Sequence, residues 1–329
     1  MGNRLYILPA VSAGLLVFFA NGQATKPPSA TRGLAPPRTA NGHPDFSGVW
    51  NNASLTPLER PAELTNKQFF TEQEAAQFEK TRLREVNRDR RDGSNQADLD
   101  RAYNEAFFDR GTRVSRTMRT SLIVDPANGK VPPLTSEARK KWAEIQAGFV
   151  AHPADGPEDR PLPDRCLMFS QAGPPMLPGN YNDNYLIVQN DDTIVIKAEM
   201  GDITRIIPLN GRAHLPSYQR SWSGDSVGHW EGEALVVDTT NFRTSLRSRF
   251  GVIYDGMTDE NLHVTERFTR EGTGMIRYRA TVDDPTVYTA PWTVEIAMNK
   301  SEARLFEYAC HEGNYGMTGV LAGYRAQEK

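Results

Sequence analysis

The second half of the chain is a succession of short β-type runs separated by turn residues, and this pattern limits the possible folds more than any other feature. Eight runs follow one another at hairpin spacing, which predicts an antiparallel meander. Because closure removes exposed strand edges, such a meander is expected to form a barrel or a sandwich. The runs are 185–189, 193–200, 204–209, 234–239, 262–269, 275–282, 293–298 and 305–310.

The first half of the chain has a different character. Residues 66–91 lack Gly and Pro and place apolar side chains at helical spacing, and shorter helices are expected at 98–109 and 135–148. A strand within 119–131 is expected to pair with the later sheet. The fold class predicted is therefore mainly β, a lipocalin- or calycin-like barrel or sandwich with an N-terminal helical insert at about 60–150, α+β overall.

Residues 1–24 have the pattern of a secretory signal peptide. Arg4 precedes an apolar run over 5–20 that is short for a spanning helix, and small residues precede a cleavage point after Ala24. Residues 25–41 are rich in Pro, Ala and Thr and are expected to form a flexible linker. We therefore expect a single β-rich domain over 42–329, periplasmic or secreted, without a stable membrane anchor.

The two cysteines and the charge narrow the class further. In an oxidising compartment Cys166 and Cys310 are expected to form a disulfide, the alternative being two separate buried thiols. The net charge is −3, which gives no indication of nucleic-acid binding. Residues 80–120 hold eleven Lys and Arg against seven Asp and Glu, and because the signs alternate, a solvated helical face is favoured over a polyanion site.

Two sets of sequence motifs resemble those of known protein families. The segment PDFSGVW, residues 44–50, resembles the GxW opening of lipocalins and related calycin barrels, in which the Trp closes one barrel end beside an Arg from a late strand. The resemblance implies that Arg304 or Arg325 stacks near Trp50. The set PDFSGVW, SLIVDPANGK, DRCL, SWSGDSVGHWEGEALVVDTTNF, ERF and EYACHE is similar to a family of exported bacterial proteins of unassigned function, which implies no activity.

Strand alternation identifies candidate proton-transfer groups, because residues two apart share a face. Glu266 lies on the apolar face of its run, where an unpaired carboxylate is a candidate general acid or base. The alternative is a salt bridge with Arg205 or Arg279 that only fixes the barrel. Alternation in 305–311 also places Glu307 and His311 on one face, as a second candidate pair.

The Gly-rich segment 221–239 is a further candidate. The side chains expected to converge on a cavity mouth are Trp222, His229, Trp230 and Glu231. The alternative is a Gly-rich loop followed by a strand whose Trp residues plug a barrel end. The histidines of the β half show no HxH or HExxH spacing, so no metal is expected. Nucleophile-elbow, phosphate-loop and dinucleotide motifs are lacking, so no cofactor is expected.

Three functions stay open. The first is binding of a small apolar or aromatic molecule in the barrel mouth, with ligand-binding residues Arg205, Arg267, Trp222, Trp230, Tyr278 and Tyr308. The second is a cofactor-independent isomerase, cyclase, hydratase or lyase, with catalytic residues Glu266, Glu307, His311 and His229. The third is an envelope module whose helices dock a protein partner. A filled barrel with an exposed apolar patch favours the third, and the oligomeric state is open.

Overall fold

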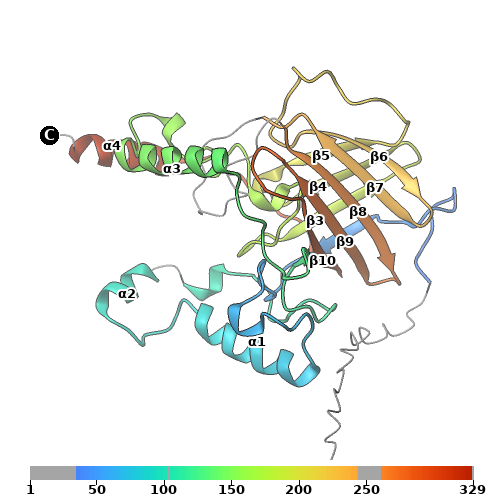
Figure 1. The fold of residues 1–329 in the computed structure, drawn as a ribbon, viewed down its shortest axis with the longest axis horizontal. Coiled ribbons are helices and arrows are strands. Elements are labelled where there is room, and N and C mark those ends of the chain that lie inside the picture. The colour runs from blue at the N-terminus through green and yellow to red at the C-terminus, as the bar shows by residue number, and fades with distance from the viewer. Residues whose placement is uncertain (1–34, 102–103, 244–260, 328–329) are drawn as a thin grey trace, which may run out of the picture.

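The protein is a nearly closed antiparallel β-barrel (Figure 1). The computed structural model describes residues 35–101, 104–243 and 261–327. Within them, nine strands pair in the order β5-β4-β3-β1-β10-β9-β8-β7-β6, and β2 pairs with β10 beside this path. The barrel predicted from the alternating runs is confirmed. The expected signal peptide, and residues 25–34 of the expected linker, lie outside the described residues.

The element bounds are as follows. The strands are β1 Gly48–Asn51, β2 Ile123–Asp125, β3 Asn184–Gln189, β4 Thr193–Ala198, β5 Thr204–Pro208, β6 Asp225–Glu231, β7 Ala234–Thr240, β8 His263–Glu271, β9 Met275–Asp283 and β10 Trp292–Ser301. The helices are α1 Glu72–Val86, α2 Asn95–Asp100, α3 Ser136–Ala151 and α4 Tyr315–Gln327. Short 3-10 turns span Ala62–Leu64, Glu105–Phe107, Pro157–Asp159, Ser170–Ala172 and Met200–Asp202.

Period-two alternation builds the barrel wall. In β8 every second side chain, from Val264 through Glu266 to Arg270, is buried, while those between are partly exposed. The strand predicted within 119–131 is confirmed as β2, which pairs with β10.

Two of the expected elements are wrong and one helix was not predicted. Residues 305–310 form no strand, because no neighbouring strand pairs with them. The helix expected over 98–109 is instead α2 followed by the separate 3-10 turn Glu105–Phe107, with 102–103 outside the described residues. Helix α4 follows the segment that was expected to be a strand.

One barrel end is closed by the segment that enters the fold. Phe46 is buried against Phe268, and the Trp50 indole donates to the Phe46 carbonyl at 2.8 Å. The guanidinium of Arg270, on β8, lies 4.6 Å from the centre of the Trp50 ring. An Arg from a late strand therefore does pack on this Trp. The specific partners Arg304 and Arg325 were wrong, since both lie on the exposed C-terminal segment.

The other end is plugged by a loop before β3. Met176 is completely buried, its N–H donates to the Tyr278 hydroxyl at 2.9 Å, and its carbonyl accepts from the Asn52 amide at 3.0 Å. Tyr185 in turn donates to the Gln171 carbonyl at 2.9 Å. Side chains thus fill the barrel from both ends.

The seam of the barrel is the gap between the two edge strands, β5 and β6, which are not paired by ladder hydrogen bonds. A Cβ at Gly228 would lie 2.7 Å from Leu209 and 3.0 Å from Ile207, so the close approach of the edges needs a glycine. The Arg205 guanidinium crosses the seam to the Ser226 hydroxyl at 3.3 Å. Side chains, rather than a backbone ladder, therefore close the barrel.

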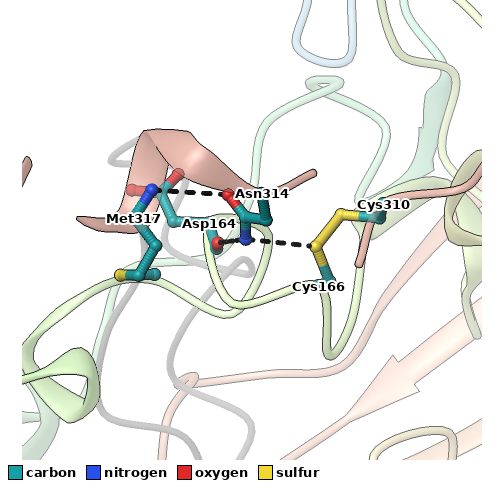
Figure 2. The surroundings of a disulfide bond; sticks show 5 residues. All are labelled: Asp164, Cys166, Cys310, Asn314 and Met317. Atoms are coloured by element: carbon teal, nitrogen blue, oxygen red, sulfur yellow. Dashed lines mark hydrogen bonds between the residues drawn. A yellow bond between two sulfur atoms is a disulfide. The ribbon is translucent and has the colours of Figure 1, made fainter. Parts of the chain in front are cut away.

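The remaining elements lie outside the barrel. Helix α1 begins with a capping box of Thr71 and Glu74 and packs Ala75 into a small second core with Leu55 and Phe70. The Cys166–Cys310 disulfide is formed and precedes α4, whose first turn is fixed by the Asn314 side chain (Figure 2). No helix among the described residues is long and apolar enough for a transmembrane segment.

Candidate functional site

The predicted acid–base residue Glu266 lies at the centre of a buried ion pair. Both of its oxygens accept from the Arg205 guanidinium, and Oε1 also accepts from the Tyr278 hydroxyl at 2.8 Å. Glu266 is 0% exposed and Arg205 4%. The prediction that Glu266 points inward is confirmed, and so is the salt bridge with Arg205, the alternative weighed against catalysis.

The other predicted site residues do not join this group. Glu307, His311 and His229 are exposed, and His229 contacts Glu231 at 3.2 Å. Arg267 points outward and pairs with the same Glu231 at 2.6 Å.

The predicted aromatic residues are separated as well. Trp230 stacks on His43 at 4.2 Å, which matches the alternative that it plugs a barrel end. Trp222 lies under the Arg243 guanidinium, and Tyr308 packs edge-on against Phe169 outside the strands. The structure therefore brings together only Glu266, Arg205 and Tyr278 of the predicted set.

A pocket of about 540 Å³ lies outside the barrel, between the helical insert and two loops that adjoin the barrel. One wall carries five arginines and one carboxylate, from α1 and the segment that follows it. The other wall is the turn at 54–57 and the pair Gly179 and Asn180. The charged lining residues are Arg82, Glu85, Arg88, Arg90, Arg101 and Arg110.

The arginines are held in place but are not fully neutralised. The Arg110 guanidinium bonds the Glu105 carboxylate at 2.9 Å and the Val86 carbonyl at 3.1 Å, and it lies 4.3 Å from the centre of the Phe108 ring. Arg88 lies over the same ring at 5.4 Å and pairs with no carboxylate among the described residues. The pocket wall therefore presents a net positive charge.

Several guanidinium N–H groups of this wall have no hydrogen-bond acceptor in the described part of the chain. They are Nε of Arg90, which lies 3.3 Å from the Asp92 carboxylate in an ion pair without hydrogen-bond geometry, and both Nε and Nη2 of Arg101, all removed from solvent. Among the described side chains, the nearest carboxylate oxygens to Arg101 lie 3.7 and 3.8 Å away, on Asp98 and Asp92. Buried donors in native proteins are normally paired, and within the described residues those of Arg101 are left without a hydrogen bond.

A buried carboxyl lies directly behind the opposite wall. Asp183 is 0% exposed, and its Oδ1 accepts from the backbone N–H of Gly179 at 2.8 Å. Its Oδ2 has no donor among the described residues. Burial, and the charge of Asp109, raise the Asp183 pKa to about 7 against the opposing hydrogen bond from Gly179.

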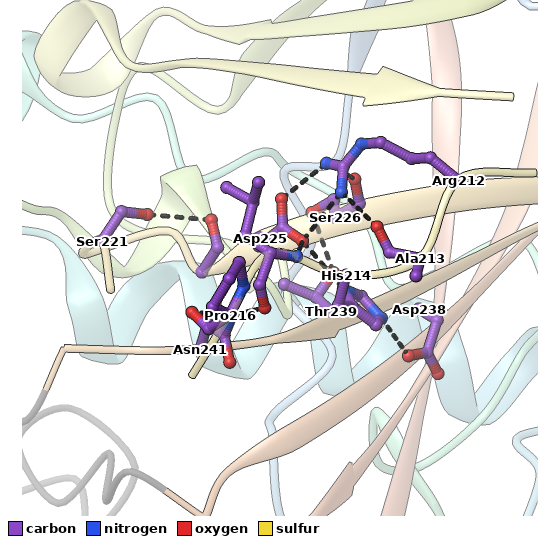
Figure 3. A network of polar contacts seen from close by, with 12 residues as sticks. Arg212, Ala213, His214, Pro216, Ser221, Asp225, Ser226, Asp238, Thr239 and Asn241 are labelled. Carbon is purple, nitrogen blue, oxygen red and sulfur yellow. Dashed lines mark hydrogen bonds and ion pairs between the residues drawn. The ribbon is translucent and has the colours of Figure 1, made fainter. Parts of the chain in front are cut away.

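A second polar cluster lies on the outer face of β6, β7 and β8 (Figure 3). His214 contacts Asp225 through Nδ1 at 2.9 Å and Asp238 through Nε2 at 2.8 Å, and His263 bonds the other oxygen of Asp238. Arg212 completes this network of polar contacts by pairing with Asp225. These contacts hold the loop at 210–216 against the barrel wall.

Comparison with known proteins adds no assignment: no protein-family model and no curated protein matches the chain. Fold and site together define a filled β-barrel with an arginine-lined pocket on its helical insert. Sequence reasoning did not select these arginines. Their excess over acidic residues in 80–120 was the one available signal, and the alternation of charge signs favoured a solvated face.

Proposed function

We propose that this protein binds a small anionic molecule in the arginine-lined pocket, and that it does so in the periplasm or after secretion. The observation that carries this proposal is the excess of charge in a pocket of about 540 Å³, which is lined by five arginines and one carboxylate. An anionic oxygen is the acceptor that guanidinium groups bind most strongly. The pocket volume is within the range of small-molecule sites.

The filled barrel supports a site outside it. Trp50, Trp292, Tyr185 and Tyr278 are fully buried members of the core, where a lipocalin-like ligand would otherwise lie. The apolar or aromatic ligand expected in the barrel mouth is therefore replaced in this proposal by an anion. The acid–base alternative has less support, because the oxygens of Glu266 are already occupied by Arg205 and Tyr278.

The disulfide supports the compartment. Cys166 and Cys310 are joined across a sequence separation of 144 residues, and such bonds persist in oxidising environments. This agrees with the signal-peptide pattern of residues 1–24.

The test is isothermal titration of the purified protein with sodium sulfate and with sodium phosphate at low ionic strength. We expect one saturable site whose affinity falls as chloride is added, since salt screens and competes with anions. Arg101→Ala and Arg88→Ala should each weaken binding by ten- to a hundred-fold, the range for hydrogen bonds to charged groups.

The matched control is Arg267→Ala, which removes an arginine that is paired on the outer barrel face away from the pocket. It should change the affinity by less than about two-fold, since the contact is exposed. The proposal is wrong if neither anion binds at millimolar concentration, or if the pocket variants bind as well as the control.

A further inference from the structure

We propose that Asp183 couples proton binding to anion binding, so that the arginine-lined pocket takes up a proton together with its ligand. This inference rests on the proposed function and specifies how that site is regulated. The geometry that supports it is the position of the Asp183 carboxyl, one hydrogen bond behind the pocket wall at Gly179.

The surroundings of Asp183 favour its neutral form. The carboxyl is sealed from solvent and receives one hydrogen bond, whereas an ionised carboxylate needs several to replace its water. The Asn52 side chain oxygen, next along the same packed region, is also buried and without a donor. Asn52 and Asp183 are linked by the hydrogen bond from the Asn52 N–H to the Asp183 carbonyl at 3.1 Å. A proton on the carboxyl supplies a donor in a region where two buried oxygens, Asn52 Oδ1 and Asp183 Oδ2, have none among the described residues.

The charged and titratable groups around the carboxyl come from three neighbouring segments. Asp109, whose N–H donates to the Asn180 carbonyl at 2.8 Å, lies on the adjoining segment and disfavours a second negative charge. The Tyr185 hydroxyl, from β3, is fully buried and donates to the Gln171 carbonyl. Beyond Gly179 and Asn180 lie the pocket arginines, whose charge a bound anion neutralises.

An anion bound beyond Gly179 adds a negative charge that disfavours an ionised Asp183, as the charge of Asp109 does. At an effective dielectric constant of about 20, two charges on the order of 10 Å apart change each other's equilibrium by roughly ten-fold. The raised pKa of Asp183, about 7, places the change within the range in which binding can be measured. Because the residues lining the pocket include no histidine, no imidazole of the pocket wall contributes to the same change.

The experiment measures the dissociation constant of sulfate between pH 5.5 and 8.5, for the full chain and for Asp183→Asn. Sulfate keeps its charge across this range, so the probe itself does not titrate. We expect the dissociation constant of the unmodified protein to rise about ten-fold with pH, and that of Asp183→Asn to stay constant. Titration in buffers of different ionisation enthalpy should also show proton uptake at pH 7, and only in the unmodified protein.

The outcomes separate the two proposals. Absence of sulfate binding at every pH overturns the proposed function. Binding with the same affinity at pH 5.5 and 8.5, or a pH dependence that persists in Asp183→Asn, leaves the anion site standing and overturns the coupling. If Asp183→Asn does not fold, Asp109→Asn serves instead: removing the like charge should move the midpoint to lower pH, and an unchanged midpoint overturns the coupling.

Discussion

Arg205 on β5 and Glu266 on β8 form a two-point ion pair inside the barrel, although β5 is an edge strand and β8 lies within the sheet. The same guanidinium reaches Ser226 on β6, so one side chain joins the two edge strands to the barrel interior. A pair this deeply buried is costly to break, because the remaining charge is left without a partner.

Replacing one member of this pair should therefore destabilise the protein strongly. We expect Arg205→Met to lower the free energy of unfolding by about 3–5 kcal/mol, measured by urea denaturation. Tyr278→Phe, which removes the hydroxyl between Glu266 and the Met176 N–H, should cost about 1–3 kcal/mol. An Arg205→Met variant as stable as the parent would show that the pair does not fix the seam.

Asp183 should make the protein less stable as the pH rises. Its pKa is raised from 3.8 to about 7 in the folded protein, so the folded state binds more protons than the unfolded state between these values. The free energy of unfolding should fall from pH 4 to pH 7 and level off above, by about 4 kcal/mol for a shift of this size. Asp183→Asn should lose this component, and denaturation at pH 5 and pH 8 tests it.

The disulfide should stabilise the region around α4. In the chain-entropy model, closing a loop of 144 residues contributes about 5 kcal/mol. Cys166→Ser with Cys310→Ser should lower stability by up to that amount and increase hydrogen exchange in residues 315–327 first. Exchange that rises equally in β8 and α4 would instead mean that the bond stabilises the whole barrel.

The polar cluster around Asp225 should hold the loop at 210–216 against the barrel except at strongly acidic pH. Burial raises the pKa of Asp225, but hydrogen bonds from Arg212, the Leu215 N–H and His214 outweigh it and lower the value to about 2. A lowered pKa gives stability that is present above the ordinary value near 4 and lost as the pH falls towards 2. Asp225→Asn should therefore speed hydrogen exchange of the Leu215 amide at pH 6, and unchanged exchange would contradict this.

The contact between His263 and Asp238 in the same cluster should stabilise the fold only within a limited pH range. The hydrogen bond raises the pKa of His263 and lowers that of Asp238, so the pair stabilises the fold between the two ordinary values and weakens outside them. Both side chains are more than a quarter exposed, so the contribution to stability is small.

The barrel was predictable because most of its strands show their buried face in the sequence. β8 alternates throughout and β9 alternates from Ile276 onward, and their expected bounds are within two residues of those observed. β6 was not predicted, because its inward positions, Ser226, Gly228 and Trp230, do not form an apolar stripe in the sequence. The close approach of the two edge strands at the seam explains these residues.

The errors in the C-terminal region have a physical cause. Residues 305–310 alternate as a strand does, but alternation forms a strand only where a partner supplies the ladder. Helix α4 contains Gly316, Gly319 and Gly323, residues of low helix propensity. The lack of a strand partner for 305–310, and a helix rich in glycine after it, are features that apolar alternation in the sequence does not report.

The pocket was the least predictable part. Charges that alternate along the chain are expected to pair with one another, and only the folded positions show that Arg88 and Arg101 face a hollow. Asp183 carried no signal, because its burial depends on the loop that ends at Gly179.

Because the interior of the barrel is filled, two different sets of side chains serve structural support and the proposed ligand binding. In a barrel with an open central cavity, the same residues stabilise the barrel and bind the ligand. A substitution that changes the ligand therefore also changes the stability of the barrel. In the function proposed here, the core that includes Trp50 and Tyr278 supports the scaffold, and the arginines on the insert bind the ligand. On this proposal, substitutions in the insert should change ligand selectivity while the barrel core keeps its contribution to the folding free energy.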